Sequence, residues 1–303
     1  MKVEECVTTV ALLASGRDGR LWDAIVVDRQ LKDQLLHQAL LSLRVRPLLP
    51  FEVSALHGLI MLYGSPGTGK TTLARGLAAE LAEYVTGHQV RMIEVNPHGL
   101  MSAEHGQSQQ RVTELLAEYV PSLADDGMPT IVVLDEVEAM TVARSAASLS
   151  ANPADVHRAT DAVLTALDSN AATHPHLVVT ATSNFTDTLD EAFLSRCDAA
   201  VLIPLPSPAA IAQILAATLR DFAALDLALG RLAESPMLAR VAARLDGIDG
   251  RQARKLVTEA MARRLDTVLD PGALTPADLL AAAEDWAAGR IHRPSRGDRD
   301  AAA

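Results

Sequence analysis

The sequence predicts an α/β protein in which a parallel five-stranded sheet is flanked by helices and followed by a small all-helical domain. Three observations support this fold class. Short apolar runs bounded by turn formers recur along the first two thirds of the chain, and helical patterns fill the spaces between them. After the proline-rich segment 204–208 only helical patterns follow. Strands that alternate with helices at this spacing form βαβ units, whose strands pair in parallel.

The predicted organisation has four parts. Residues 1–20 form a short N-terminal segment, 21–206 a large α/β domain, 207–290 a helical domain, and 291–303 a disordered tail rich in arginine, proline and glycine.

The elements of the α/β domain follow in order. A short extended piece at 24–27 precedes an amphipathic helix that ends near Leu43. Strands are expected at 58–63, 91–95, 130–134, 177–182 and 199–203. Helices are expected near 70–84, 108–119, 154–167 and 189–195, and beyond the proline-rich segment near 208–222, 236–245, 250–265 and 275–288.

Composition limits the function classes. The chain has 303 residues, 49% of them hydrophobic but only 3% aromatic, which favours a helix-rich core. A formal charge of −11 disfavours wholesale nucleic-acid binding. The apolar run 7–14 follows Glu4 and Glu5, which oppose a signal peptide, and no apolar stretch reaches the ~18 residues of a membrane helix. Cys6 and Cys197 lack metal-ligand spacing. We therefore expect a cytoplasmic protein without membrane contact.

A glycine-rich motif lies between the first predicted strand of the sheet and the helix that follows it. Residues 64–71 read GSPGTGKT, which matches the Walker A pattern in the context that pattern requires. Its glycines let backbone N–H groups wrap around phosphates, Lys70 would reach the β- and γ-phosphates, and the Thr71 hydroxyl would bind Mg²⁺. The expected ATP-binding residues are Gly64, Ser65, Pro66, Gly67, Thr68, Gly69, Lys70, Thr71 and Thr72.

A second motif closes the strand at 130–134 with two acids. The sequence IVVLDE ends in Asp135 and Glu136. A buried strand that ends in a carboxylate places Asp135 at the carboxyl edge of the sheet, where it would bind the Mg²⁺ ion together with Thr71. Glu136 is then expected to orient and deprotonate the attacking water.

Three further residues are candidates for assisting hydrolysis. Asn184 follows the fourth strand, Arg196 lies between a helix and the last strand, and Arg251 opens a helix of the second domain. Such groups act on the transition state. Taken alone, Asn184 could be a turn former, and both arginines could be solvated surface residues.

These elements, in this order, resemble AAA+ ATPases. Within that group the chain is similar to the pachytene-checkpoint family, also called the thyroid-hormone-receptor-interactor-thirteen family. The segments that carry the similarity span about residues 21–290: LWD at 21–23, DEVE at 135–138, DAVLT at 161–165, TSN at 182–184 and GIDGRQARKL at 247–256. The resemblance implies that Asn184 is sensor-1, Arg196 an arginine finger and Arg251 sensor-2.

The resemblance also implies partners. It implies a homohexameric ring in which Arg196 reaches ATP bound by the neighbouring subunit. The implied substrate is a HORMA-domain protein, which in the bacterial branch is associated with a cyclic-oligonucleotide synthase in antiphage defence. The implied activity is ATP-driven remodelling of HORMA complexes. ATP and Mg²⁺ are the implied cofactors.

Two features depart from the family pattern. Only about 20 residues precede Leu21, so substrate recognition by a large N-terminal domain is not expected. The segment that corresponds to the first pore loop has no aromatic residue, and Met101, Glu104 and His105 are its candidate substrate contacts. An ordinary surface loop remains an alternative there. The loop at 142–157 is either a second pore loop or a plain connection.

A nucleotide-gated scaffold that binds partners without threading them remains the alternative function, because the same ATP site serves switches. A small-molecule P-loop kinase is disfavoured by the helical domain and the sensor-type residues.

Overall fold

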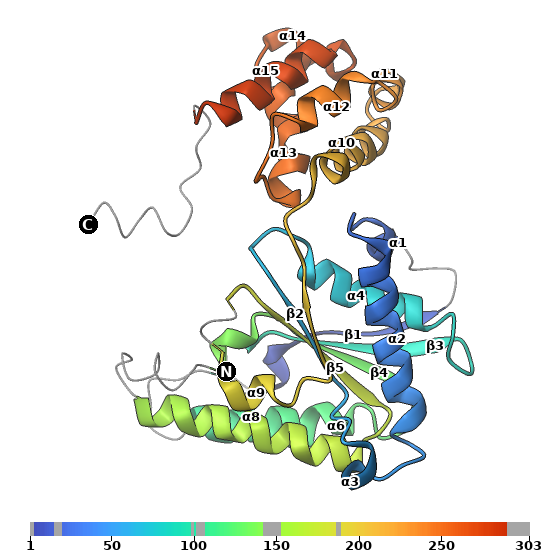
Figure 1. Cartoon of the computed structure of the whole chain (residues 1–303), viewed down its shortest axis with the longest axis vertical. Helices are drawn as coiled ribbons and strands as arrows, with labels where there is room; N and C mark the ends of the chain where they lie inside the picture. Colours follow the sequence, from blue (N-terminus) through green and yellow to red (C-terminus); the bar gives the residue numbers. More distant parts are fainter. Residues whose placement is uncertain are drawn as a thin grey trace. The chain divides into compact units, whose positions relative to one another are not determined.

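The computed structural model describes residues 3–14, 20–97, 100, 107–141, 153–185 and 189–289 (Figure 1). The chain divides into two compact units, Met1–Pro204 and Leu205–Ala303, and each is described by itself. The predicted boundary follows residue 206, inside the same proline-rich segment. The predicted tail at 291–303 lies outside the described residues.

The first unit is built on a six-stranded sheet with the order β1-β3-β4-β5-β2-β6. Five of its strands are those that the sequence predicts, and they pair in parallel. They are β2 (Leu59–Tyr63), β3 (Gln89–Val95), β4 (Thr130–Leu134), β5 (Leu177–Ser183) and β6 (Ala199–Leu202). The predicted α/β class with a parallel sheet is therefore confirmed, with one strand more than expected.

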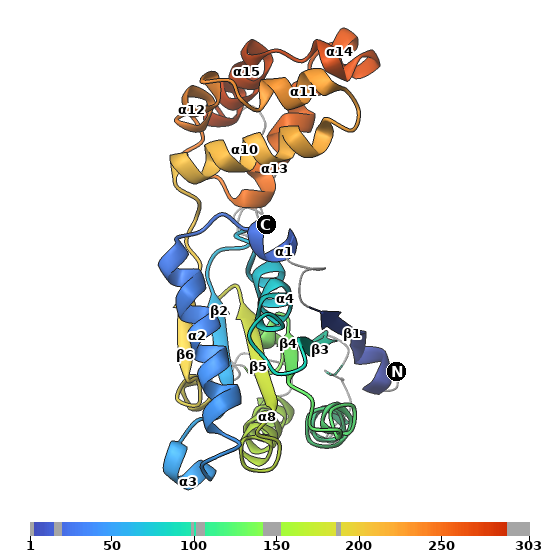
Figure 2. The same ribbon diagram turned by 90° about the vertical axis from the view of Figure 1, so that its right-hand side faces the viewer.

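The additional strand is β1 (Val7–Ala14), which pairs antiparallel with β3 from Val7↔Val95 to Ala14↔Gln89. Figure 2 shows it at the margin of the sheet, beside β3. The 3₁₀ turn η1 (Val3–Cys6) precedes it, and the Asn96 N–H donates to the Cys6 carbonyl at 2.9 Å. Local sequence did not predict β1 because its partner lies far along the chain.

Helices cover both faces of the sheet (Figures 1 and 2). One apolar core lies between the sheet and α1 (Arg20–Asp23), α2 (Arg29–Val45) and α4 (Lys70–Leu81), with the short α3 (Phe51–Ser54) following α2. The other core involves α5 (Gln107–Thr113), η3 (Glu114–Tyr119), α6 (Val120–Ser122), η4 (Val137–Ala139), α8 (Pro153–Thr173) and α9 (Glu191–Leu194). Strands β4 and β5 are buried along their whole length, as continuous apolar runs require.

The segment before α2 packs onto α4, and the short extended piece expected at 24–27 forms no strand of the sheet. A Cβ added to Gly76 would lie 2.6 Å from the Trp22 backbone nitrogen, and one added to Gly69 would lie 2.5 Å from Ile25 Cδ1. Trp22 is buried, and Lys32 Nζ donates to its carbonyl at 2.6 Å. The close approach of α1 to α4 therefore depends on glycine at position 76.

The second unit is all-helical, as the sequence predicts. The four predicted helices are α10 (Pro208–Phe222), α12 (Met237–Ala242), α13 (Gly250–Met261) and α15 (Pro276–Ala287). Three short elements were not predicted: α11 (Leu227–Leu232), α14 (Leu265–Leu269) and the 3₁₀ turn η5 (Pro271–Ala273). Across the described ranges, no helix is both long and apolar enough to span a bilayer.

The helix expected at 108–119 changes its hydrogen bonding at η3, which is a π-helix. The Val120 N–H bonds to the Leu115 carbonyl, five residues back. The next donor in that pattern is residue 121, a proline, which has no N–H. Asn170 Nδ2 donates to the Leu116 carbonyl instead, at 2.8 Å. The buried Asn170 side chain of α8 therefore replaces a backbone donor that Pro121 lacks.

We predict that Asn170→Leu lowers the free energy of unfolding by about 1–3 kcal/mol, because it leaves the buried Leu116 carbonyl without a donor. Pro121→Ala restores an N–H at the position that the π-helical pattern requires. In the Pro121→Ala background, Asn170→Leu should therefore lower the free energy of unfolding by clearly less. Urea denaturation of the four variants measures the coupling, and equal costs in both backgrounds would contradict the assignment.

Candidate nucleotide site

The loop after β2 depends on glycines with positive φ. Gly64 has φ 142°, and a Cβ there would lie 2.3 Å from the Ile203 carbonyl oxygen. Gly69 has φ 95° and is the N-cap of α4, where no side chain caps the helix. An anion is the ligand that a helix N-terminus favours.

Lys70 folds back over this loop. Its ammonium donates to the Gly64 carbonyl at 2.8 Å, the Ser65 carbonyl at 2.9 Å and Asn184 Oδ1 at 2.8 Å. The residue is only 6% exposed. The positive charge is thus held inside the loop by oxygen acceptors, beside the turn that follows β5.

The other predicted phosphate residues lie around the same loop. Ser65 and Pro66 are exposed, whereas Thr68 is buried and its hydroxyl donates to the Ser65 carbonyl at 3.0 Å. Gly67 has φ 80°, and Thr72 lies in the first turn of α4.

Sheet register brings the two motifs and the turn after β5 to one edge. Strand β5 lies between β2 and β4. Tyr63 pairs with Ser183, and Leu134 pairs with Ala181. The residues that follow these pairs, on parallel strands, are therefore neighbours at the carboxyl edge.

Asp135 is held by two hydroxyl groups. Thr71 Oγ1 and Thr182 Oγ1 each donate to Asp135 Oδ1 at 2.6 Å. The three side chains come from α4, β5 and the end of β4. They form a compact set of hard oxygen atoms at the edge where the glycine loop lies.

This set fits Mg²⁺. The ion prefers oxygen ligands and is held by one or two protein groups, with water and phosphate oxygens completing its shell. Thr71 and Asp135 would be the protein ligands, as the sequence predicts. When bound there, the ion would neutralise phosphate charge.

Glu136 and Asn184 contact each other next to the oxygen atoms of Thr71, Asp135 and Thr182. Glu136 has φ 54° and ψ 53°, a conformation uncommon for residues other than glycine. Its N–H donates to Thr182 Oγ1 at 3.1 Å, and its Oε1 accepts from Asn184 Nδ2 at 3.4 Å. The Asn184 N–H donates to Glu138 Oε1 at 3.1 Å. The amide of Asn184 thus bridges the candidate base and Lys70.

The remaining candidates belong to other segments of the chain. Arg196 follows α9 and forms an ion pair with Asp168 of α8. Arg251 is exposed in the first turn of α13, in the second unit. Met101, Glu104 and His105 lie outside the described residues.

Sequence reasoning did not assign roles to three residues that the structure connects to the site residues. Thr182 links Asp135 to the Glu136 N–H, Glu138 accepts from the Asn184 N–H, and Asp168 binds Arg196. Thr182 and Glu138 occur in the segments that carry the family resemblance, which was a usable signal. Asp168 lay in no motif.

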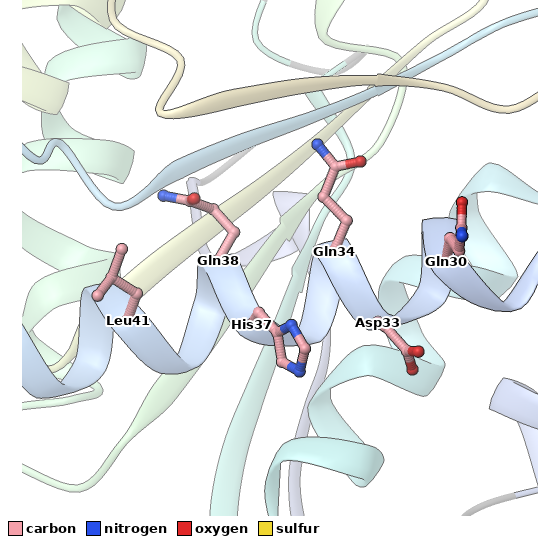
Figure 3. Close-up of a pocket in the computed structure, with 6 residues that line it drawn as sticks. All are labelled: Gln30, Asp33, Gln34, His37, Gln38 and Leu41. Atoms are coloured by element: carbon pink, nitrogen blue, oxygen red, sulfur yellow. The ribbon is translucent and has the colours of Figure 1, made fainter.

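A shallow pocket on α2 is separate from this site. Figure 3 shows its lining side chains projecting from that single helix: Gln30, Asp33, Gln34, His37, Gln38 and Leu41. None of the candidate nucleotide residues lines it. Among the described residues, no group of three or more His, Cys, Asp or Glu side chains is arranged to hold a metal ion.

Comparison with known proteins agrees with this geometry. Residues 60–205 match the family described as "ATPase family associated with various cellular activities (AAA)". The chain is 46% identical over 264 residues to CD-NTase-associated protein 6 of Pseudomonas aeruginosa, covering 87% of this chain and 86% of the relative. The chain belongs to the AAA ATPase family. It is a member of the pachytene-checkpoint branch that the sequence resembles.

More distant AAA relatives extend the comparison. The human pachytene checkpoint protein 2 homolog is 33% identical over 204 residues, which cover 66% of this chain and 47% of the relative. The chain thus spans about half the length of that protein. A structure of C. elegans PCH-2 has a TM-score of 0.72 at 23% identity, covering 94% of this chain and 76% of that one. A chain from the E. coli MS115-1 HORMA:CdnC:Trip13 complex has a TM-score of 0.73 at 16% identity, and the match covers 97% of this chain and 98% of that one. Both share the fold.

We predict that Thr182→Val lowers kcat for ATP hydrolysis about tenfold or more, because it removes the hydroxyl shared by Asp135 and the Glu136 N–H. Thr182→Ser should retain most activity. The matched control is Thr180→Val on the same strand: the Thr180 hydroxyl is buried, with no hydrogen-bond partner in the described part of the chain. Steady-state ATPase assays test this, and equal effects at both positions would argue against a specific role for Thr182.

Proposed function

We propose that this chain uses ATP hydrolysis to remodel HORMA-domain proteins and thereby limits cyclic-nucleotide signalling in antiphage defence. The observation that carries the proposal is its 46% identity, over most of both chains, to a relative named for its association with a CD-NTase. The fold shared with a chain of a HORMA:CdnC:Trip13 complex supports it. Its partners would be a HORMA-domain protein and the cyclic-oligonucleotide synthase bound to that protein.

The proposed chemistry follows from the arrangement at the carboxyl edge. Lys70 and the N–H groups of the glycine loop bind phosphate oxygens, and Thr71 and Asp135 hold the metal ion. Glu136 accepts a proton from the attacking water. Asn184 keeps that carboxylate in place, since its amide bonds both Glu136 and Lys70.

The proposed assembly is a homohexameric ring. Arg196 stabilises the transition state at the ATP site of the adjoining subunit, and Arg251 acts as sensor-2. Met101, Glu104 and His105 grip the substrate polypeptide in the pore. The paired state of Arg196 in the isolated chain supports a role outside its own glycine loop, since its partners are Asp168 and the Ala192 carbonyl.

We predict that Glu136→Gln binds ATP with near-wild-type affinity but loses at least about a hundredfold in turnover, because the water loses its base while the phosphate contacts remain. Lys70→Ala should instead lose ATP binding. Calorimetry with Mg²⁺ and a slowly hydrolysed ATP analogue, together with single-turnover assays, separates the two effects. Substantial hydrolysis by Glu136→Gln would remove Glu136 from the proposed role.

We predict that a cognate HORMA protein raises the ATPase rate and that ATP hydrolysis releases the peptide held by that protein. Release is followed by the fluorescence anisotropy of a labelled peptide, with the Glu136→Gln variant as the control that binds without turning over. An unchanged ATPase rate together with nucleotide-dependent partner binding would support the scaffold alternative instead.

A further inference from the structure

The Arg196 guanidinium is oriented from three of its nitrogens. Nε and Nη2 donate to the two carboxylate oxygens of Asp168 at 2.7 and 2.8 Å, and Nη1 donates to the Ala192 carbonyl at 2.8 Å. The paired bonds to Asp168 are the bidentate arrangement that fixes the plane of an arginine most strongly. The side chain is 23% exposed, so most of its length is covered.

Asp168 is itself well placed to act as an anchor. It lies in the 21-residue helix α8, next to the buried Leu167 of the core. The hydrogen bond from Arg196 holds the pKa of Asp168 below its usual range, so the carboxylate is charged at neutral pH. His57 Nε2 lies 3.3 Å from Asp168 Oδ1, and the backbone N–H of His57 donates to Asp198 Oδ1 at 2.9 Å. The anchor therefore joins α8 to the segments that precede β2 and β6.

The pairing leaves donors at the tip of the arginine. A guanidinium carries five N–H groups, and the three bonds to Asp168 and Ala192 use three of them. One N–H on each terminal nitrogen remains. Two such donors held in one plane match two oxygens of a phosphate group, which is the recognition that arginine provides and lysine does not.

We propose that Asp168 is a positioning residue that orients Arg196 toward the phosphates of ATP bound to an adjoining copy of this chain. This inference rests on the proposed role of Arg196. A long, mobile side chain that must reach across a subunit boundary loses rotational freedom when it engages the transition state. Asp168 removes that freedom beforehand, during folding, so the arginine is already in place when charge develops.

The first test compares steady-state ATPase kinetics of the full chain. Asp168→Ala should lower kcat between about tenfold and a hundredfold, the range expected for a misplaced catalytic group, and leave KM for ATP within about twofold. Asp168→Glu should recover part of the loss. Arg196→Ala should lower kcat further than Asp168→Ala does. The kcat of the double variant should be no lower than that of Arg196→Ala alone, because both changes act through the same guanidinium.

The chain offers a matched control. Arg91 and Asp126 form another bidentate pair, with Nη1 and Nη2 donating to the two carboxylate oxygens at 2.8 and 2.6 Å. Asp126→Ala breaks an ion pair of similar geometry outside the site and should leave kcat unchanged.

The second test uses mixed assemblies to exclude a merely structural role. Lys70→Ala subunits lack a working ATP site but carry intact Asp168 and Arg196. Adding them in excess to Asp168→Ala subunits should raise the turnover per intact ATP site toward the wild-type value. A defect in the folding of the Asp168→Ala subunit would not be relieved by its neighbour.

The outcomes are distinguishable. Full or increased activity of Asp168→Ala, or a loss that mixing does not relieve, overturns the positioning role while leaving the proposed role of Arg196 intact. Normal activity of Arg196→Ala overturns the role of Arg196 itself. The inference is supported if both Asp168→Ala and Arg196→Ala lose ATPase activity and if adding Lys70→Ala subunits restores the activity of the Asp168→Ala subunits.

Discussion

The position of β5 between β2 and β4 is the constraint on which the candidate site depends. The glycine loop and the acidic pair end strands that do not pair with each other. Side chains of β5 and of the turn after it fill the interval: Thr182 binds Asp135, and Asn184 binds Lys70 and Glu136. A change in the register of β5 by one residue would turn these groups to the other face of the sheet and separate the two motifs.

Much of the fold and of the site could be predicted from local sequence. The glycine loop and the acidic pair are contiguous, and each follows a buried apolar strand, so their placement follows from the geometry of a parallel sheet. The same pattern predicted all five parallel strands and the main helices of the second unit. Motif residues are predictable in this way because a few neighbouring residues determine both their conformation and their chemistry.

What could not be predicted depends on contacts between distant segments. β1 exists through its pairing with β3, and the carbonyl freed by Pro121 is satisfied by a side chain of α8. The pairing of Arg196 with Asp168 likewise joins the turn after α9 to α8, and no motif connects the two. Residues 24–27 have strand-forming side chains, but α1 and Ile25 pack on α4 instead, so tertiary contact decided their conformation.

The bond between the Asn96 N–H and the Cys6 carbonyl has a consequence for longer members of the family. It ties the turn that leads into β1 to the residue directly after β3. An extra domain fused ahead of this turn would therefore join the sheet at the point from which the chain continues toward the candidate pore segment.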